Sequence, residues 1–228
     1  GAPSATKAAV IEFDYTSTGD LNACSLTVTN NADVIILADD VVTLGGSLTV
    51  DTGSTFTLNS DAILLQGGTT NVNSGDVTVI RETQALKRLD YVLWSSPVAG
   101  QVLNVFSPLT NPIRYYVFDN ASYNWLSVPG ASTMIPAKGY IIRAPSNYST
   151  SAATTYVGQF VGVPNNGDYS IPIVVNTTPD PDQDRNLIGN PYPSAIDADL
   201  LLASNLTTLQ GSFYFWTHNT PITNFVYT

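Results

Sequence analysis

The residues that could do chemistry are carboxylates and aromatic rings in the C-terminal half of the chain. Asp180, Asp182 and Asp184 alternate along one segment, and hard oxygen ligands at such a spacing are what Ca²⁺ requires. The segment lacks the loop glycine and the downstream glutamate of an EF-hand, so we favour a solvated acidic loop. A structural calcium site is the alternative and the one metal prediction, and we expect no other cofactor.

Aromatic side chains on or near expected loops form the second group of candidates. The flat rings of Trp125, Tyr123 and Tyr192 can stack on the face of a sugar. Asn190 lies two residues before Tyr192, in the same Pro-containing stretch. These four residues are the candidate ligand-binding residues, and the partner that they suggest is a surface glycan or another extracellular polymer.

Catalytic machinery is not evident in the sequence. His218 is the only histidine, and no Gly-x-Ser-x-Gly or comparable nucleophile turn accompanies it. Cys24 is the only cysteine. Because no basic residue lies near it in sequence, we expect a small buried hydrophobic residue and not a reactive thiol. The sequence therefore predicts no catalytic residue and a non-enzymatic protein.

Charge and composition narrow the classes of partner. The chain of 228 residues carries 18 acidic and 8 basic side chains, for a net charge of −10, which argues against binding nucleic acid through a basic face. No apolar run approaches the ~20 residues of a membrane-spanning helix, so we expect no direct membrane insertion. A single cysteine rules out an internal disulfide and fits bacterial export. The Gly-Ala-Pro-Ser start and the strand-like last residues lead us to expect a piece of a longer protein.

Short apolar triplets repeat between residues 26 and 79. One set is Leu26-Thr27-Val28, Val42-Thr43-Leu44, Phe56-Thr57-Leu58 and Asn71-Val72-Asn73, and the other is Val34-Ile35-Ile36, Leu48-Thr49-Val50, Ile63-Leu64-Leu65 and Val77-Thr78-Val79. Within each set the triplets are about 15 residues apart, with turn residues between them. This pattern predicts a β-solenoid with two strands in each coil of about 15 residues. An antiparallel sandwich of short hairpins is the alternative.

The expected fold class is all-β, in two domains. Residues 1–85 form the short β-solenoid with an N-terminal lead-in, and residues 86–228 form an aromatic-rich antiparallel β-sandwich with one short helix, truncated at its C-terminus. The charged stretch 81–90 marks the boundary between the two domains, because the regular alternation of apolar triplets and turn residues stops there. In the second domain we expect a hairpin turn at 164–168, joining strands over 155–163 and 169–175, because Asn-Gly favours such turns. A central strand is expected over 211–217.

The stretch from Arg185 to Asp197 links a buried strand to the short helix. Gly189 ends the strand and can let another backbone approach closely. Ser194, followed three residues later by Asp197, predicts a helix start of the capping-box type. An apolar stripe of Ile196, Leu200 and Ala203 then follows the helix.

Two prolines make this stretch a rigid corner. Asn190 and Tyr192 each precede a proline and are pushed toward extended backbone, and Tyr192-Pro193 is our candidate for a cis peptide bond. The corner is either a structural element that fixes the packing of the β domain or a contact surface built around Asn190 and Tyr192.

Several segments resemble a module in large surface proteins of Bacteroidota, including gliding bacteria. The resemblance lies in Leu89-Asp90-Tyr91, Trp94-Ser95-Ser96-Pro97-Val98, Lys138-Gly139-Tyr140, Gly162 to Gly167, Asn186 to Ala198, and Tyr214 to Pro221. In those proteins the module follows a repetitive β segment and lies near a sorting signal for the type IX secretion system. The resemblance implies export to the cell surface and an adhesin-like or structural role, and it implies no catalytic residues.

The expected function is therefore that of a non-enzymatic extracellular module of a bacterial surface adhesin or surface filament, including one used in gliding. One alternative is a carbohydrate-binding module that uses the loop aromatics. Another is a self-assembling structural subunit, whose partners would be neighbouring modules of the same long chain or copies of itself.

Overall fold

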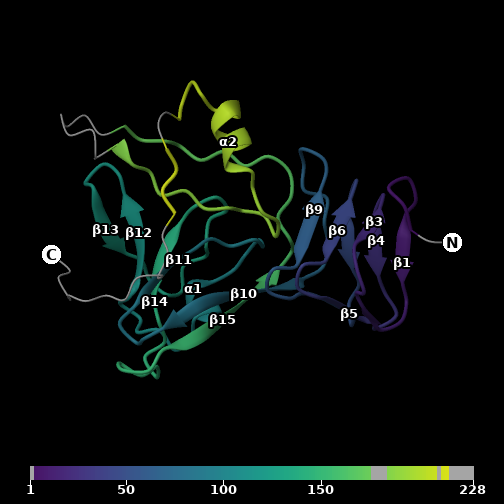
Figure 1. The fold of residues 1–228 in the computed structure, drawn as a ribbon, viewed down its shortest axis with the longest axis horizontal. Coiled ribbons are helices and arrows are strands. Elements are labelled where there is room, and N and C mark those ends of the chain that lie inside the picture. The colour runs from purple at the N-terminus through teal and green to yellow at the C-terminus, as the bar shows by residue number, and fades with distance from the viewer. Residues whose placement is uncertain (1–2, 176–183, 210–211, 216–228) are drawn as a thin grey trace.

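The computed structural model describes residues 3–175, 184–209 and 212–215 (Figure 1). These residues are mostly β, with two short helices, so the all-β class is confirmed. The N-terminal strands are β1 (Ala9–Ile11), β2 (Tyr15–Thr16), β3 (Leu21–Ala23), β4 (Leu26–Val28), β5 (Asp33–Ile36), β6 (Val41–Leu44), β7 (Leu48–Val50), β8 (Thr55–Leu58) and β9 (Ile63–Gln66). The later elements are β10 (Val77–Leu86), β11 (Tyr91–Trp94), α1 (Leu103–Phe106), β12 (Tyr115–Asp119), β13 (Asn124–Ser127), β14 (Tyr140–Arg143), β15 (Thr154–Gly162) and α2 (Ala198–Ser204).

Every third strand of the N-terminal part pairs in parallel. The ladders run β1-β4-β7, β2-β5-β8-β10 and β3-β6-β9, so the chain passes along three sheets in turn before it returns to the first. Leu26 pairs with Leu48, Val34 with Phe56, and Val42 with Leu64. Partners in β4-β7, β5-β8 and β6-β9 are therefore 22 residues apart, and those in the first coil are 17 to 21 apart. The predicted coil of about 15 residues with two strands is wrong.

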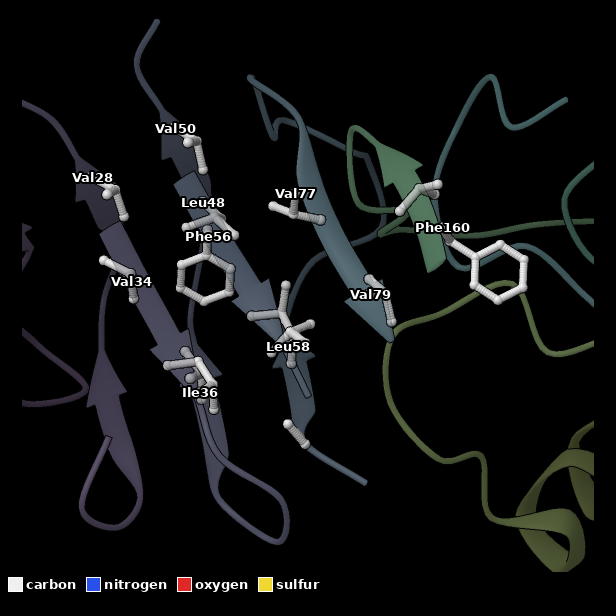
Figure 2. Close-up of a cluster of buried hydrophobic side chains, with 14 of the residues drawn as sticks. Val28, Val34, Ile36, Leu48, Val50, Phe56, Leu58, Val77, Val79 and Phe160 are labelled. Carbon is white, nitrogen blue, oxygen red and sulfur yellow. The ribbon is translucent and has the colours of Figure 1, made fainter. Parts of the chain in front are cut away.

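Side chains alternate between inward and outward positions along each short strand, and the inward ones form the interior of the N-terminal part. Six of the eight triplets have a buried-intermediate-buried pattern, with threonine at many of the middle positions. The triplet Asn71-Val72-Asn73 forms no strand, so that prediction is wrong. Figure 2 shows the inward side chains of successive coils stacked in rows, among them Val34, Ile36, Phe56 and Leu58. Because β-branched and aromatic residues suit a pleated surface that is buried on one side, the apolar positions form the core and threonine faces outward.

Residues with left-handed backbone, at positive φ, form the turns between strands. Asp39 and Asp61 have φ of 68° and 69°, a region that Asn and Asp visit more readily than most residues. At another corner Asn31, Gly53 and Gly75 follow one another at the 22-residue interval, all with positive φ. A Cβ on Gly75 would lie 1.9 Å from the carbonyl oxygen of Val50, so only glycine fits there.

The strand β10 joins the two parts of the chain. It pairs in parallel with β8 and in antiparallel with β15, from Val77↔Gly162 to Leu86↔Thr154. One sheet, in the order β15-β10-β8-β5-β2, thus runs from the coils into the second part. The expected strand over 155–163 is confirmed as β15.

A four-stranded antiparallel sheet, β11-β14-β12-β13, makes up the far side of the second part. Its inner face packs against β15 and α1 through aromatic rings. Trp94 meets Phe106 edge-on at 4.8 Å between centroids, and Phe106 stacks on Phe160 at 4.2 Å. Leucine, valine and phenylalanine of the coils belong to the same continuous core as these rings.

Several local predictions are wrong. Residues 169–175 and 212–215 contain no strand, and residues 164–168 are therefore not a hairpin turn. The loop instead docks on the last coil, where the amide of Asn166 donates to the carbonyl oxygen of Gly67 at 2.9 Å. Cys24 is exposed, because it lies on the outer side of β3's end, next to buried Ala23.

The corner and its helix also differ from expectation. No cis peptide bond occurs in the described residues, so Tyr192-Pro193 is trans. The helix α2 begins at Ala198, capped by Asp197, whose carboxylate accepts from the amide of Leu200 at 2.9 Å. Asp197 thus takes the capping role expected of Ser194. Leu200 is 65% exposed and no residue of α2 is buried, so the apolar stripe is not a core stripe.

Among the described residues, no helix has the length and the apolar character that crossing a membrane requires.

Candidate functional site

The candidate site is the outer face of the four-stranded sheet. Residues directly opposite one another in antiparallel strands point to the same side. The pairs Tyr91↔Arg143, Leu93↔Ile141, Tyr116↔Ile141 and Phe118↔Trp125 all lie on the side away from the core. Arg114, two residues before Tyr116, continues the same face. We call the set Tyr91, Arg114, Tyr116, Phe118, Trp125 and Arg143 the outer sheet face.

Three rings form an aromatic cluster at one end of this face. Phe118 meets Trp125 at 5.2 Å and Tyr123 at 5.1 Å, both edge-on. Trp125 is 41% exposed and lies on β13, the edge strand of the sheet. Tyr123 is in the turn before β13 with φ of 50°. The structure thus brings two of the predicted binding residues, Trp125 and Tyr123, together around Phe118.

Two tyrosines and two arginines occupy the other end of the face. The rings of Tyr91 and Tyr116 lie 6.1 Å apart, and Arg114 donates from Nη1 to the Tyr116 hydroxyl at 3.1 Å. This hydrogen bond raises the pKa of Arg114. Burial is the main cause that raises the pKa of Tyr91, with Tyr116 adding to it. Arg114 and Tyr91 therefore hold their protons at neutral pH.

The other two predicted residues, Asn190 and Tyr192, lie at a different place. The Asn190 side chain donates to the carbonyl oxygen of Ser194 at 2.6 Å and accepts from the amide of Tyr192 at 2.9 Å. The Tyr192 hydroxyl donates to the carbonyl oxygen of Gly167 at 2.6 Å. Burial, followed by nearby Asp168, raises the pKa of Tyr192. Asn190 thus uses its polar atoms inside the corner, and Tyr192 ties the corner to the loop at 164–168.

The corner closes the last coil of the N-terminal part. The amide of Leu64, on β9, donates to the carbonyl oxygen of Pro193 at 3.0 Å. Arg81 donates to the carbonyl oxygens of Ile80 at 2.8 Å and Ala62 at 3.3 Å, and it reaches Pro193 at 3.4 Å. Burial lowers the pKa of Arg81, and the nearby carboxylate of Asp61 opposes that shift. The close approach expected at Gly189 is confirmed, because a Cβ there would lie 2.9 Å from the Lys138 carbonyl oxygen.

A cavity of about 650 Å³ lies between the corner, β11 and α2, and both Asn190 and Tyr192 line it. Its walls are mostly apolar and include Leu93, Trp94 and Leu187. A smaller cavity of about 270 Å³ lies on the other side of Tyr192, beside Asn165 and Asn166.

The proposed calcium ligands are only partly within the described residues. Asp184 is exposed, whereas Asp180 and Asp182 lie outside the described residues, as does His218. In the part of the chain that the structure describes, no three His, Cys, Asp or Glu side chains gather as a metal site would need.

Sequence reasoning missed Tyr91, Arg114, Tyr116 and Arg143. The period of two in Arg114-x-Tyr116-x-Phe118 is the signal that marks one face of a strand. That signal could group these three residues, but only the pairing of β12 with β14 and β11 adds Arg143 and Tyr91 to them.

Comparisons with known proteins give one match. Neither the curated proteins nor the solved structures contain a match to the chain. A family model described as "Domain of unknown function (DUF8693)" matches residues 1–228, which is the whole chain. The chain therefore belongs to the DUF8693 family.

Proposed function

We propose that this chain is a non-enzymatic adhesive module, displayed outside a bacterial cell as part of a surface adhesin or surface filament. In this proposal residues 9–79 are a three-sided β-solenoid, and the later residues form a sandwich-like tip. The resemblance to Bacteroidota surface proteins is what suggests export by the type IX system and a role in gliding.

The observation that carries the proposal is the aromatic cluster of Phe118, Tyr123 and Trp125. It lies on β12 and β13, at the opposite end of the long axis from β1 (Figure 1). A rigid sheet holds the rings, so little conformational entropy is lost when a ligand stacks on them. An exposed tryptophan at the tip of an elongated scaffold suits carbohydrate binding, and a surface glycan is the ligand class that we propose.

Binding to a broad glycan array tests this function, with a matched pair of variants on one strand. Trp125 and Leu126 are 41% and 46% exposed and point to opposite sides of β13. We expect wild-type protein to bind saturably and Trp125→Ala to weaken binding about tenfold, since an aromatic contact contributes ~0.5–1.5 kcal/mol beyond its buried area.

The control Leu126→Ala should bind as wild type does. The proposal fails if wild-type protein binds no glycan across the array, or if the two variants lose binding equally.

A second candidate function is self-association through the coils. In the described residues no strand pairs with the outer edges of β1, β2 and β3, and unpaired edges are templates for pairing with another chain. The other end of the coil stack is covered by β15, the loop at 164–168 and the corner. Association by coil ends would therefore stop at a pair of copies and would not extend into a filament.

A further inference from the structure

We propose that Arg114 and Arg143 form a binding site for an anionic group, and that the group is the carboxylate or sulfate ester of an acidic polysaccharide. This inference rests on the proposed glycan binding and specifies that the glycan is negatively charged.

The two arginines are cross-strand neighbours on the outer sheet face. The amide of Arg143 donates to the carbonyl oxygen of Arg114 at 3.2 Å. Both residues continue the register in which Tyr115 pairs with Ile142 and Tyr116 with Ile141. Their side chains therefore leave the sheet on one side, next to each other. Like charges directly opposite in a sheet destabilise it, so this arrangement costs stability in the absence of a ligand.

No described carboxylate neutralises the arginines. Arg114 donates to the neutral hydroxyl of Tyr116, and the Nε atoms of both Arg114 and Arg143 are buried without a hydrogen-bond partner. Arg81 shows the contrast, since its guanidinium donates to four backbone carbonyl oxygens. Because those Nε atoms are buried, a ligand would reach the pair through the terminal Nη atoms. Two adjacent positive charges without a described carboxylate partner are what an anion would neutralise.

The chemistry of the arginine side chain fits a planar or tetrahedral oxyanion. Each guanidinium presents donors in a rigid fork that matches carboxylate and sulfate oxygens, and such charge-assisted hydrogen bonds are stronger than neutral ones. The rings of Tyr116, Phe118 and Trp125 continue along the same face. A sugar chain lying along that face would stack on the rings and place its acidic substituent at the arginines.

The two arginines make the site positively charged, whereas the protein as a whole is acidic. The chain has a net charge of −10 and only 8 basic residues, so its overall field repels polyanions. At about 0.1 M salt that repulsion is screened beyond ~10 Å, whereas the two arginines act in direct contact. Recognition of an acidic glycan here would therefore depend on these two side chains and not on general attraction.

Calorimetric titration with three polymers tests the site, all at physiological salt. The probes are polygalacturonate for carboxylate, dextran sulfate for sulfate ester, and dextran as the neutral polymer. We expect at least one acidic polymer to bind more tightly than dextran. The variants Arg114→Gln and Arg143→Gln should each weaken that binding about tenfold, because each removes one positive charge and its charge-assisted hydrogen bonds to the ligand. Lys7→Gln, which removes one positive charge at the far end of the molecule, should leave it unchanged.

Thermal unfolding of the ligand-free variants gives an independent readout. If the arginines repel each other, Arg143→Gln has the Tm of wild type or a higher one. A Tm lowered by several degrees would show that the pair stabilises the fold, and it would overturn the inference. The inference would also be overturned if neither arginine substitution weakened binding of the acidic polymers. The same holds if dextran bound as tightly as the acidic polymers. Loss of dextran binding in Trp125→Ala would still support the proposed function, whereas no binding of any glycan would remove both proposals.

Discussion

At the residue scale, asparagine amides replace backbone pairing where strands stop. Asn186 accepts from the amide of Val174 at 3.0 Å and donates to its carbonyl oxygen at 2.9 Å, as a neighbouring strand would. Asn73 accepts from the amide of Leu48 at 2.7 Å and donates to the carbonyl oxygen of Pro164 at 3.0 Å. Because a buried backbone group without a partner is costly, Asn73 lets the last coil end in contact with the second part. The pair of Asn186 and Val174 lies within the second part.

We predict that Asn73→Ala destabilises the protein by about 1–3 kcal/mol, since it leaves the amide of Leu48 without its acceptor. Chemical denaturation would measure the loss, and amide hydrogen exchange would show faster exchange at Leu48. Asn22→Ala is the control, because Asn22 is exposed on β3 and should change stability little. Equal stability of Asn73→Ala and wild type would contradict the capping role.

At the element scale, the strands β3 to β8 of the coils bury two side chains each and have no stability of their own. Phe56, on β8, is 1% exposed and lies between Val34 of the previous coil and the next coil (Figure 2). Strands of three or four residues depend on this stacking between coils, because one short strand buries too little apolar surface to be stable alone.

We predict that Phe56→Ala costs about 3–5 kcal/mol of unfolding free energy through lost burial and the cavity left behind. Phe13→Ala is the matched control, since Phe13 is 76% exposed and its removal should change stability by less than about 0.5 kcal/mol. Denaturant titration measures both, and similar losses in the two variants would refute the stacked-core account.

The period of the coils shows where sequence reasoning succeeded and where it failed. Apolar triplets correctly marked most of the strands of the coils, because alternation is a local property. The period was wrong because the three sides of a coil look alike, and a spacing of about 15 residues joins every second strand. The 22-residue repeat of Leu26-Thr27-Val28 in Leu48-Thr49-Val50, and of Gly45-Gly46 in Gly67-Gly68, is the signal that identifies the true period.

The candidate site was only half predictable for a related reason. Trp125 and Tyr123 were found from their types and their place beside a turn. Arg143 joins them only through the register between β12 and β14, which the sequence does not encode locally. Likewise the Pro-Asn-Asn-Gly loop has strong local turn preferences, but the tertiary hydrogen bonds of Asn165 and Asn166 decide its conformation.

At the scale of the whole molecule, one end of the coil stack is covered by the second part, and no described strand pairs with the outer edge of β1 at the other end. The ladder of β1 with β4 uses the amide of Ala9 and the carbonyl oxygen of Ile11. Backbone groups alternate in direction along a strand, so the amide and carbonyl of Val10 point to the open edge. An added strand from a second copy would bond to these groups.

We predict that the protein forms pairs at high concentration and no larger assemblies, as light scattering would show. Val10→Pro removes the outward amide without touching the ladder to β4, and proline is tolerated on sheet edges, so this variant should stay monomeric. Val10→Ala keeps the amide and should still pair. Monomeric wild-type protein at high concentration would rule out this mode of association.

The parallel ladders also decide how the length of such a molecule can vary. Each added coil of 22 residues advances the stack by one interstrand step of about 4.8 Å, whereas the same residues in an extended chain would span about 73 Å. A duplication or deletion of one whole coil would keep every row of side chains in line, whereas an insertion within a strand would break the rows. The turns already vary in length, since Ala9 pairs with Leu26 and Leu26 with Leu48 in one ladder. The length of such a stack therefore grows by a fixed step for each added coil. The stack is much shorter than the same residues in an extended chain, but it is stiffer.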